Sequence, residues 1–280
     1  MSAMLLSFVL PTFGVAQPRA ANDTTRPSVP RLALLGSGVI AGGIAVHFAR
    51  YVPLWNDHLT SFHFHEDFSY ALNQDKLLHA FGGMAGTRLS SSLYRWAGYD
   101  DDEALWLGAA TSFGFLTFMK IEDGHIDYLG FDRVDEAANL VGVFYPVAQH
   151  YVPILVSITP KASYSPSSND VSAANQTVPR FLEDHQGQHF WLGFTLHDLV
   201  PAEAKRYIPP IVGIAVGRAV SDLDGPHPYH EVILALDLDL RKMPGDSPFL
   251  RTLWEVLNYI HLPMPAVRIS PSVVWYGIYF

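Results

Sequence analysis

The 280-residue chain contains no cysteine. Without thiols the sequence can form neither disulfide cross-links nor thiolate metal sites, and it offers no cysteine nucleophile and no cysteine for lipidation. We therefore expect any attachment to a membrane to come from apolar helices or from partners. The absence does not distinguish the cytosol from the bacterial envelope, because proteins of both compartments can lack cysteine.

Charged residues are also scarce. Asp, Glu, Lys and Arg make up 16% of the chain, whereas roughly a quarter is usual for soluble globular domains. The net charge is −9, and no run of basic residues offsets it. Because nucleic-acid binding requires clustered Lys and Arg to neutralise phosphates, we expect no nucleic-acid partner.

Motifs that would indicate a particular reaction are missing. The sequence has no phosphate-binding glycine loop, no dinucleotide fingerprint and no serine-nucleophile elbow. It also lacks the HExxH spacing of a two-histidine zinc site, and His63 and His65 have no evident third ligand. The sequence therefore predicts neither a substrate nor a cofactor.

Hydrophobic residues, by contrast, make up 49% of the chain and aromatic residues 13%. Such an aromatic excess is typical of interfaces, where amphipathic rings lie at the membrane boundary. Residues 1–22 form an apolar leader with small residues near its end, as in export signals, although it begins without Lys or Arg. We therefore expect an exported protein of the bacterial cell envelope that contacts a membrane or lipid. A protein partner and the oligomeric state are left open.

Four apolar segments predict helices at 32–49, 77–94, 104–121 and 137–158. The first is about the minimum for crossing a membrane, which needs roughly 20 apolar residues. Pro146 or Pro153 would kink or end the last one. Length alone leaves open whether each helix spans a bilayer or is buried in a bundle, and we favour membrane association. The segments make 30–160 an apolar helical domain of about four helices.

The periodicity changes after a Ser- and Asn-rich stretch at 161–178, which we interpret as a linker. Strict alternation over 232–240 predicts a strand with one buried face, and three further stretches have a similar pattern, at 190–196, 211–220 and 266–280. Ser247 and Pro248 are typical of an N-cap followed by the first residue of a helix. The predicted fold class is thus α+β, with an antiparallel β domain and one packed helix over 179–280.

Seven polar residues lie within or at the ends of the apolar helices: Asp75, Lys76, His79, Glu122, Asp123, Asp135 and Asn139. Asp75 and Asp135 have an ordinary interpretation as first-turn acids that complement a helix dipole, whereas Glu122 and Asp123 follow a helix and oppose its dipole. Taken together they predict one polar cluster, because polar groups in apolar surroundings are costly unless they pair. The cluster could bind a metal through His79, Glu122 and Asp135, relay protons, hold a head group or only fix the helices, and the sequence leaves these alternatives open.

The same residues, in their sequence spacing, also resemble the motifs of a known protein family. The segments Asp75-Lys76-Leu77-Leu78-His79, Glu122-Asp123-Gly124 and Asp135-x-x-x-Asn139-x-x-Gly142 together resemble the YfiM-type family of uncharacterised bacterial periplasmic or envelope proteins. They are similar, more remotely, to VanZ-like membrane proteins associated with glycopeptide resistance. The similarity begins near residue 62 and includes the strand at 236–240 and the helix FLRTLWEVLN of longer members. Val134 and His125 depart from the family pattern, and many members carry a lipidated cysteine that this chain lacks. The resemblance implies an envelope location and a helical architecture, and no reaction.

Three functions fit these observations. The first is a non-catalytic envelope protein that acts as a scaffold or docking surface. The second is a lipid-handling protein or hydrolase in which His79, Glu122 and Asp135 act as acid, base or cation ligands. The third is a carrier of a small ligand in the β domain.

Overall fold

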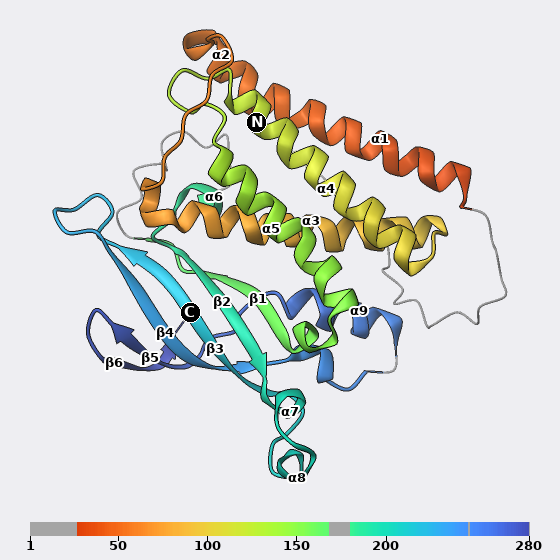
Figure 1. The fold of residues 1–280 in the computed structure, drawn as a ribbon, viewed down its shortest axis with the longest axis vertical. Helices are drawn as coiled ribbons and strands as arrows, with labels where there is room; N and C mark the ends of the chain where they lie inside the picture. Colours follow the sequence, from red (N-terminus) through yellow and green to blue (C-terminus); the bar gives the residue numbers. More distant parts are fainter. Residues whose placement is uncertain (1–26, 168–179, 246, 280) are drawn as a thin grey trace, which may run out of the picture.

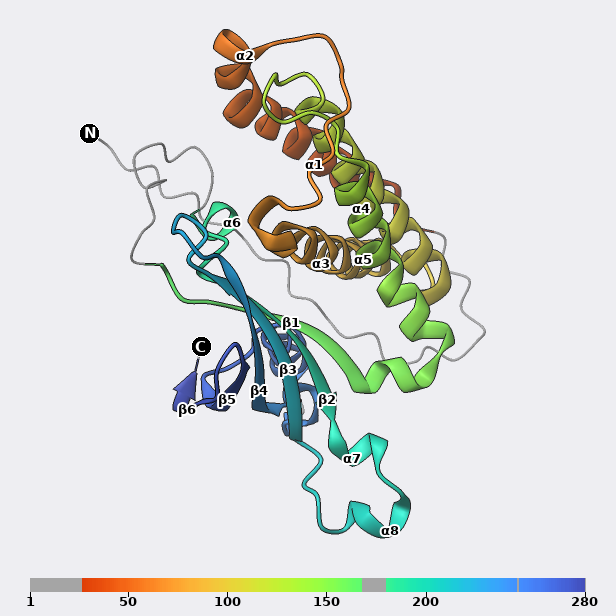
Figure 2. The same ribbon diagram turned by 60° about the vertical axis from the view of Figure 1, so that its left-hand side comes forward.

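The computed structural model describes residues 27–167, 180–245 and 247–279, and the predicted leader at 1–22 lies outside them. Helices fill the N-terminal half, and a six-stranded antiparallel sheet follows. Figures 1 and 2 show the long helices on one side of the sheet. The α+β class, with N-terminal helices and an antiparallel β half, is confirmed.

Long helices lie over the four predicted apolar segments, although the last of them ends at Tyr151, before the predicted end at 158. They are α1 (Val29–Val46), α3 (Gln74–Ala97), α4 (Asp101–Asp123) and α5 (Arg133–Tyr151). The first of them continues through the π-helical segment η1 (His47–Tyr51) into α2 (Val52–His58). Asp100 caps α4 by accepting a hydrogen bond from the Glu103 amide, and Pro146 lies inside α5 without ending it.

Shorter helices connect these elements, namely η2 (Tyr70–Asn73), η3 (Pro153–Ser157), α6 (Arg180–Glu183), α7 (Leu196–Leu199), α8 (Ala202–Lys205) and η5 (Leu240–Lys242). The strands are β1 (Ile158–Tyr164), β2 (Gln188–Thr195), β3 (Val212–Ser221), β4 (Tyr229–Leu238), β5 (Met264–Ser270) and β6 (Val274–Tyr279). They lie in the sheet in chain order, each antiparallel to the next. The predicted single helix of this half is α9 (Pro248–Leu257), whose N-cap Ser247 accepts a hydrogen bond from the Leu250 amide at 3.2 Å.

Glycines allow α3 to contact α5 with backbone against backbone. A Cβ atom on Gly142 would lie 1.9 Å from the Ala80 carbonyl oxygen, and one on Gly83 would lie 2.6 Å from the Asn139 carbonyl oxygen. No side chain larger than hydrogen fits such an approach. The contact places the first turns of α3 and α5 beside each other, and it gives Gly142 of the D-x-x-A-N-x-x-G segment a helix-packing role.

β4 has the predicted alternation, and its buried face is the one that carries the aspartates. Asp237 and Asp239 are 5% and 3% exposed, whereas Leu234 and Leu236 are 40% and 46% exposed. Burial of the two carboxylates is possible because each has a partner: Asp237 accepts a hydrogen bond from Lys161 at 2.9 Å, and Asp239 accepts one from Thr195 at 2.8 Å.

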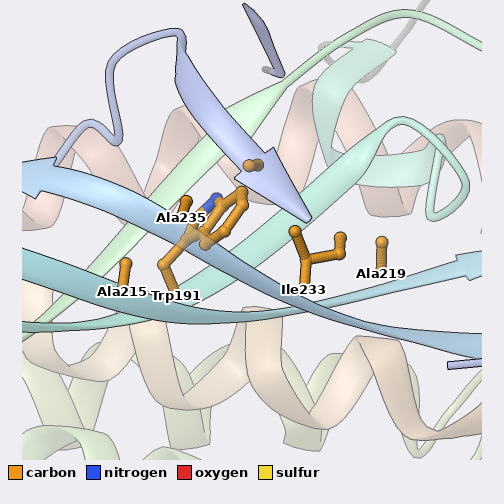
Figure 3. Packing of buried hydrophobic residues seen from close by; sticks show 6 residues of the cluster. Trp191, Ala215, Ala219, Ile233 and Ala235 are labelled. Atoms are coloured by element: carbon orange, nitrogen blue, oxygen red, sulfur yellow. The ribbon is translucent and has the colours of Figure 1, made fainter. Parts of the chain in front are cut away.

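The rest of this buried face is a small apolar core. Its members are Trp191, Ala215, Ala219, Ile233, Ala235 and Ala266, of which Figure 3 labels five. The ring of His261 stacks on Trp191 with 3.9 Å between centroids. The chain's own side chains therefore fill this face, so it gives no support to the hypothesis of a small-ligand carrier.

The predicted linker boundary at 161 needs correction, because it falls inside β1. Thr159 and Lys161, which share the inward face of this strand, are 4% and 2% exposed. A strand whose inward residues are polar has no apolar alternation, and the sequence pattern therefore missed it. The later part of the predicted linker, from 168 on, lies outside the described residues.

Candidate functional site

Six of the seven predicted polar residues meet in one network centred on the Asp135 carboxylate. Lys76 Nζ lies 2.6 Å from one oxygen of Asp135, and Lys120 Nζ donates to the other at 2.8 Å. His79 Nε2 lies 3.3 Å from that second oxygen. Asp135 thus contacts three side chains on two other helices, α3 and α4.

The remaining members extend the network on both sides. Lys76 also contacts Asp75 at 2.7 Å and Asp132 at 3.2 Å. On the α4 side, Lys120 contacts Asp123 at 3.2 Å. We call this set the Asp135 network, and its members are Asp75, Lys76, His79, Lys120, Asp123, Asp132, Asp135 and Asn139.

The helix ends explain why these side chains converge. Asp75 and Asp135 lie in the first turns of α3 and α5, where a carboxylate is favoured by the helix dipole. Lys120 lies in the last turn of α4, where a cation is favoured. Asp123 opposes the dipole of α4, and it gains compensation from Lys120 and from the Tyr51 hydroxyl, which donates to it at 2.9 Å.

The Asp135 network shifts the pKa values of several of its members. Burial raises the pKa of Asp135, but the hydrogen bond from His79 and the charges of His79 and Lys120 outweigh it, so this pKa lies well below its ordinary value. Burial lowers the pKa of Lys76, but its bonds to Asp135 and Asp75 outweigh burial and raise it. For Asp75 burial dominates, and the pKa is raised.

His79 is held through both ring nitrogens. Nδ1 lies 3.1 Å from Oδ1 of Asn139, whose amide nitrogen donates to Glu136 at 2.9 Å and so fixes which end of the amide faces the ring. Nε2 faces the Asp135 carboxylate. Each ring nitrogen of His79 thus faces an oxygen of a neighbouring side chain. In this arrangement neither nitrogen is available to accept a proton from a substrate.

Glu122 does not join the network. Its carboxylate lies 3.1 Å from Nδ1 of His47, in the π-helical segment η1. The predicted metal set of His79, Glu122 and Asp135 is therefore divided between two ion pairs. Within the part of the chain that the structure describes, no group of three or more His, Cys, Asp or Glu side chains is arranged to hold a metal ion.

Three residues of this region were not among the predicted site residues. Lys120 and Asp132 complete the charge pairing, and Tyr51, which is fully buried, donates to Asp123. Lys120 had a signal in the sequence, since it is the single charge within the apolar segment 104–121. Asp132 had one too, as the cap of α5, where it accepts from the Val134 amide at 2.7 Å.

The burial of the network fits an internal lock between helices. Asn139 is fully buried, and Asp123, Asp132 and Asp135 are almost so. The most exposed of the predicted members is His79, with 23% of its side chain accessible. Gln74, which precedes Asp75, donates to the Gln188 carbonyl of β2 at 2.8 Å, so the network also lies beside the junction of the two halves.

Residues 62–149 match the model of a family described as "Predicted periplasmic lipoprotein (DUF2279)". The match extends from the loop before α3 to the end of α5 and contains all seven predicted polar residues. No curated protein and no solved structure matches the chain. The matched segment thus resembles an uncharacterised periplasmic family, and the predicted location, an exported protein associated with the cell envelope, is confirmed.

Proposed function

We propose that the protein is a non-catalytic, membrane-associated scaffold or docking protein of the cell envelope. The observation that carries the proposal is the continuous helical segment Val29–His58, whose most apolar 18-residue stretch has a mean hydropathy of 1.8 and is only 6% buried. A helix that is apolar and unburied is expected to contact lipid.

A second helix, α4, also has the length and composition to cross a membrane, but it is 33% buried and packs against α3 and α5. Leu34, Ile40, Ile44 and Phe48 along the first helix are all more than half exposed. With no cysteine in the 280 residues to carry a lipid, this first helix is the part of the chain best suited to hold the protein at a membrane.

Cations lie at both ends of the apolar stretch. Arg31 donates to the Trp96 carbonyl at 2.7 Å, and its guanidinium lies 5.1 Å from the centroid of the Trp96 ring. Arg50 follows 19 positions later, about 28 Å along a helix. Two arginines at that spacing, one of them on an indole, match the two polar boundaries of a hydrocarbon layer about 30 Å thick.

The Asp135 network supports the non-catalytic part of the proposal. Each of its four carboxylates contacts at least one of the two lysines of the same network, and both nitrogens of His79 face acceptors. A buried and internally paired set of charges fixes the register of helices, and it leaves no group free for proton transfer. The resemblance to YfiM-type proteins, which is narrower than the family match, is likewise part of what we propose.

Membrane fractionation tests the proposal. We expect the full chain to stay with membranes through carbonate extraction, and the double variant Ile40→Glu/Ile44→Glu to move to the soluble fraction. The matched control is the double variant Phe249→Glu/Val256→Glu, which places the same two charges on exposed apolar positions of α9 (64% and 55% exposed). Release of the unmodified protein by carbonate, or retention of the double variant, would contradict membrane association through this helix.

The exposure of His79 favours one second candidate, a lipid-handling protein or hydrolase that uses this histidine with Asp135. The two candidates differ in the behaviour of His79→Ala. A structural lock predicts a lower free energy of unfolding together with weaker complementation of a deletion strain. An unchanged free energy of unfolding with lost complementation would instead support chemistry at His79.

A further inference from the structure

An open groove runs between α1 and α4, which lie side by side in Figures 1 and 2. It has a volume of about 570 Å³, within the range of roughly 300–1,000 Å³ typical of ligand sites. The first helix contributes Ile40, Ile44 and Phe48, and α4 contributes Gly114, Phe115 and Phe118. The groove is continuous with the exposed apolar surface of Val29–His58.

The polar side chains in the lining have partners outside the groove. The Thr111 hydroxyl lies 2.9 Å from the Tyr94 hydroxyl, and Nδ1 of His47 lies 3.1 Å from Glu122. All other lining residues are apolar or glycine. An occupant consequently gains its binding free energy from burial of apolar surface, which favours hydrocarbon over a sugar, peptide or nucleotide.

Two glycines keep the groove open without being needed for helix contact. A Cβ atom on Gly114 would meet no atom within 4 Å, and one on Gly43 would meet only the Phe118 ring, at 3.9 Å. Gly83 and Gly142 differ, since there a Cβ would overlap backbone atoms of the neighbouring helix. Side chains at Gly43 and Gly114 would fill the groove and leave the helices in place.

A cation lies beyond one end of the groove. Arg50 is within one helical turn of the lining residue His47, in the π-helical segment η1, and such segments are frequent at functional sites. Its ion pair with Glu183 is 3.9 Å long. Its Nε is buried, and no hydrogen-bond partner for it exists among the described residues. Its guanidinium also lies 5.7 Å from the centroid of the Tyr51 ring, and 29% of the Arg50 side chain is accessible. This cation is complementary in charge to a phosphate.

We propose that the α1–α4 groove binds one acyl chain of a membrane phospholipid and that Arg50 holds the phosphate of the same molecule. The proposal rests on the membrane association proposed above and adds a defined lipid site to it. The proposed lipid site is confined to the groove. The other exposed side chains of the first helix would contact lipid without holding one phospholipid molecule at a fixed place.

Photolabelling of the full chain in phosphatidylglycerol vesicles tests the site. The probe is a phosphatidylglycerol with a diazirine on one acyl chain, and labelled residues are located by mass spectrometry. We expect labels to concentrate on the groove residues. Gly114→Leu should reduce this labelling about tenfold, because its side chain displaces several methylene groups of the acyl chain. Gly82→Leu is the control, since a Cβ there also meets no atom within 4 Å and Gly82 lies on α3, outside the groove.

A second arm tests Arg50. Diacylglycerol with the same photoreactive chain lacks the phosphate, so the unmodified protein should label less with it than with phosphatidylglycerol. Arg50→Gln should remove this difference and retain labelling in the groove. If Arg50→Gln keeps the difference, the phosphate contact is wrong.

The outcomes separate the site from the proposed function. Labels spread evenly over the exposed apolar helices and insensitive to Gly114→Leu would overturn the groove and leave membrane association intact. Failure of the unmodified protein to bind the vesicles at all would overturn membrane association as well.

Discussion

Replacing Asp135 by Asn removes the negative charge that Lys76, Lys120 and His79 share. The amide is nearly the same size as the carboxylate, so the change tests charge more than packing. Lys120 keeps Asp123, and Lys76 keeps Asp75 and Asp132. Both lysines are buried, and both lose the carboxylate that lies nearest to their ammonium group.

The magnitude follows from burial. Lys120 and Asp135 are 8% and 6% exposed, and removing one partner of such a buried pair typically costs about 3–5 kcal/mol. The free energy of unfolding should therefore fall by about 3–5 kcal/mol in Asp135→Asn. Arg133→Gln is the control on the same helix. It breaks an ion pair with Glu66 in which the arginine side chain is 67% exposed, and such surface pairs contribute about 0–1 kcal/mol.

The free energy of unfolding of both variants is measured by denaturant titration of the detergent-solubilised protein, with circular dichroism as the signal. The double variant Asp135→Asn/Lys120→Met should recover part of the loss, because it removes a buried cation that has lost its closest partner. A loss below about 1 kcal/mol in Asp135→Asn, equal to that of Arg133→Gln, would refute the view that this carboxylate holds the helices together.

The pH dependence gives an independent check of the same charge. The pKa of Asp135 is lowered in the folded protein from an ordinary value of 3.8. The unfolded chain therefore takes up its proton first as the pH falls, and the stabilisation by Asp135 is complete above about pH 4 and decreases below it. Asp135→Asn should show a shallower decrease of stability from pH 4 downwards, and an unchanged slope would contradict the assigned pairing.

Two further changes test the packing and the sheet. Gly142→Ala places a methyl group 1.9 Å from the Ala80 carbonyl and should lower the free energy of unfolding by about 3 kcal/mol or more. Gly82→Ala, which meets open space, should be neutral or stabilising by up to about 1 kcal/mol, and equal effects of the two would contradict the close helix contact. Lys161→Met leaves Asp237 buried without its cation and should destabilise by about 3–5 kcal/mol. Asp237→Asn in the same background should restore part of that loss, and no recovery in chemical denaturation would argue against a direct pair.

The long helices were predictable because each apolar segment is long and bounded by recognisable ends. The convergence of the Asp135 network followed from a single argument, the cost of isolated polar groups in apolar helices. That argument requires partners without specifying them. It therefore brought six of the seven residues together and did not decide whether the charges serve chemistry or hold the fold.

The sheet shows where hydrophobic pattern fails. Alternation located β4, but the leucines on one face outnumber the apolar residues on the other, and the face with Asp237 and Asp239 is the buried one. Asp237 pairs with Lys161 of β1 and Asp239 with Thr195 of β2, both from strands distant in the sequence, and Asp239 also pairs with the nearby Arg241. Which face of a strand is buried was thus decided by pairing across the sheet, which no local pattern contains.

The division between Glu122 and Asp123 was, in contrast, accessible from helical geometry. At 100° per residue, Asp123 lies about 60° from Lys120 around the helix, whereas Glu122 lies about 160° away. Lys120 is a buried cation within an apolar helix and must face its partners. The acid on its own side, Asp123, therefore joins the Asp135 network, and the acid on the opposite side faces His47 and the first helix. The position of Lys120 therefore distinguishes the two adjacent carboxylates, although they belong to one sequence motif.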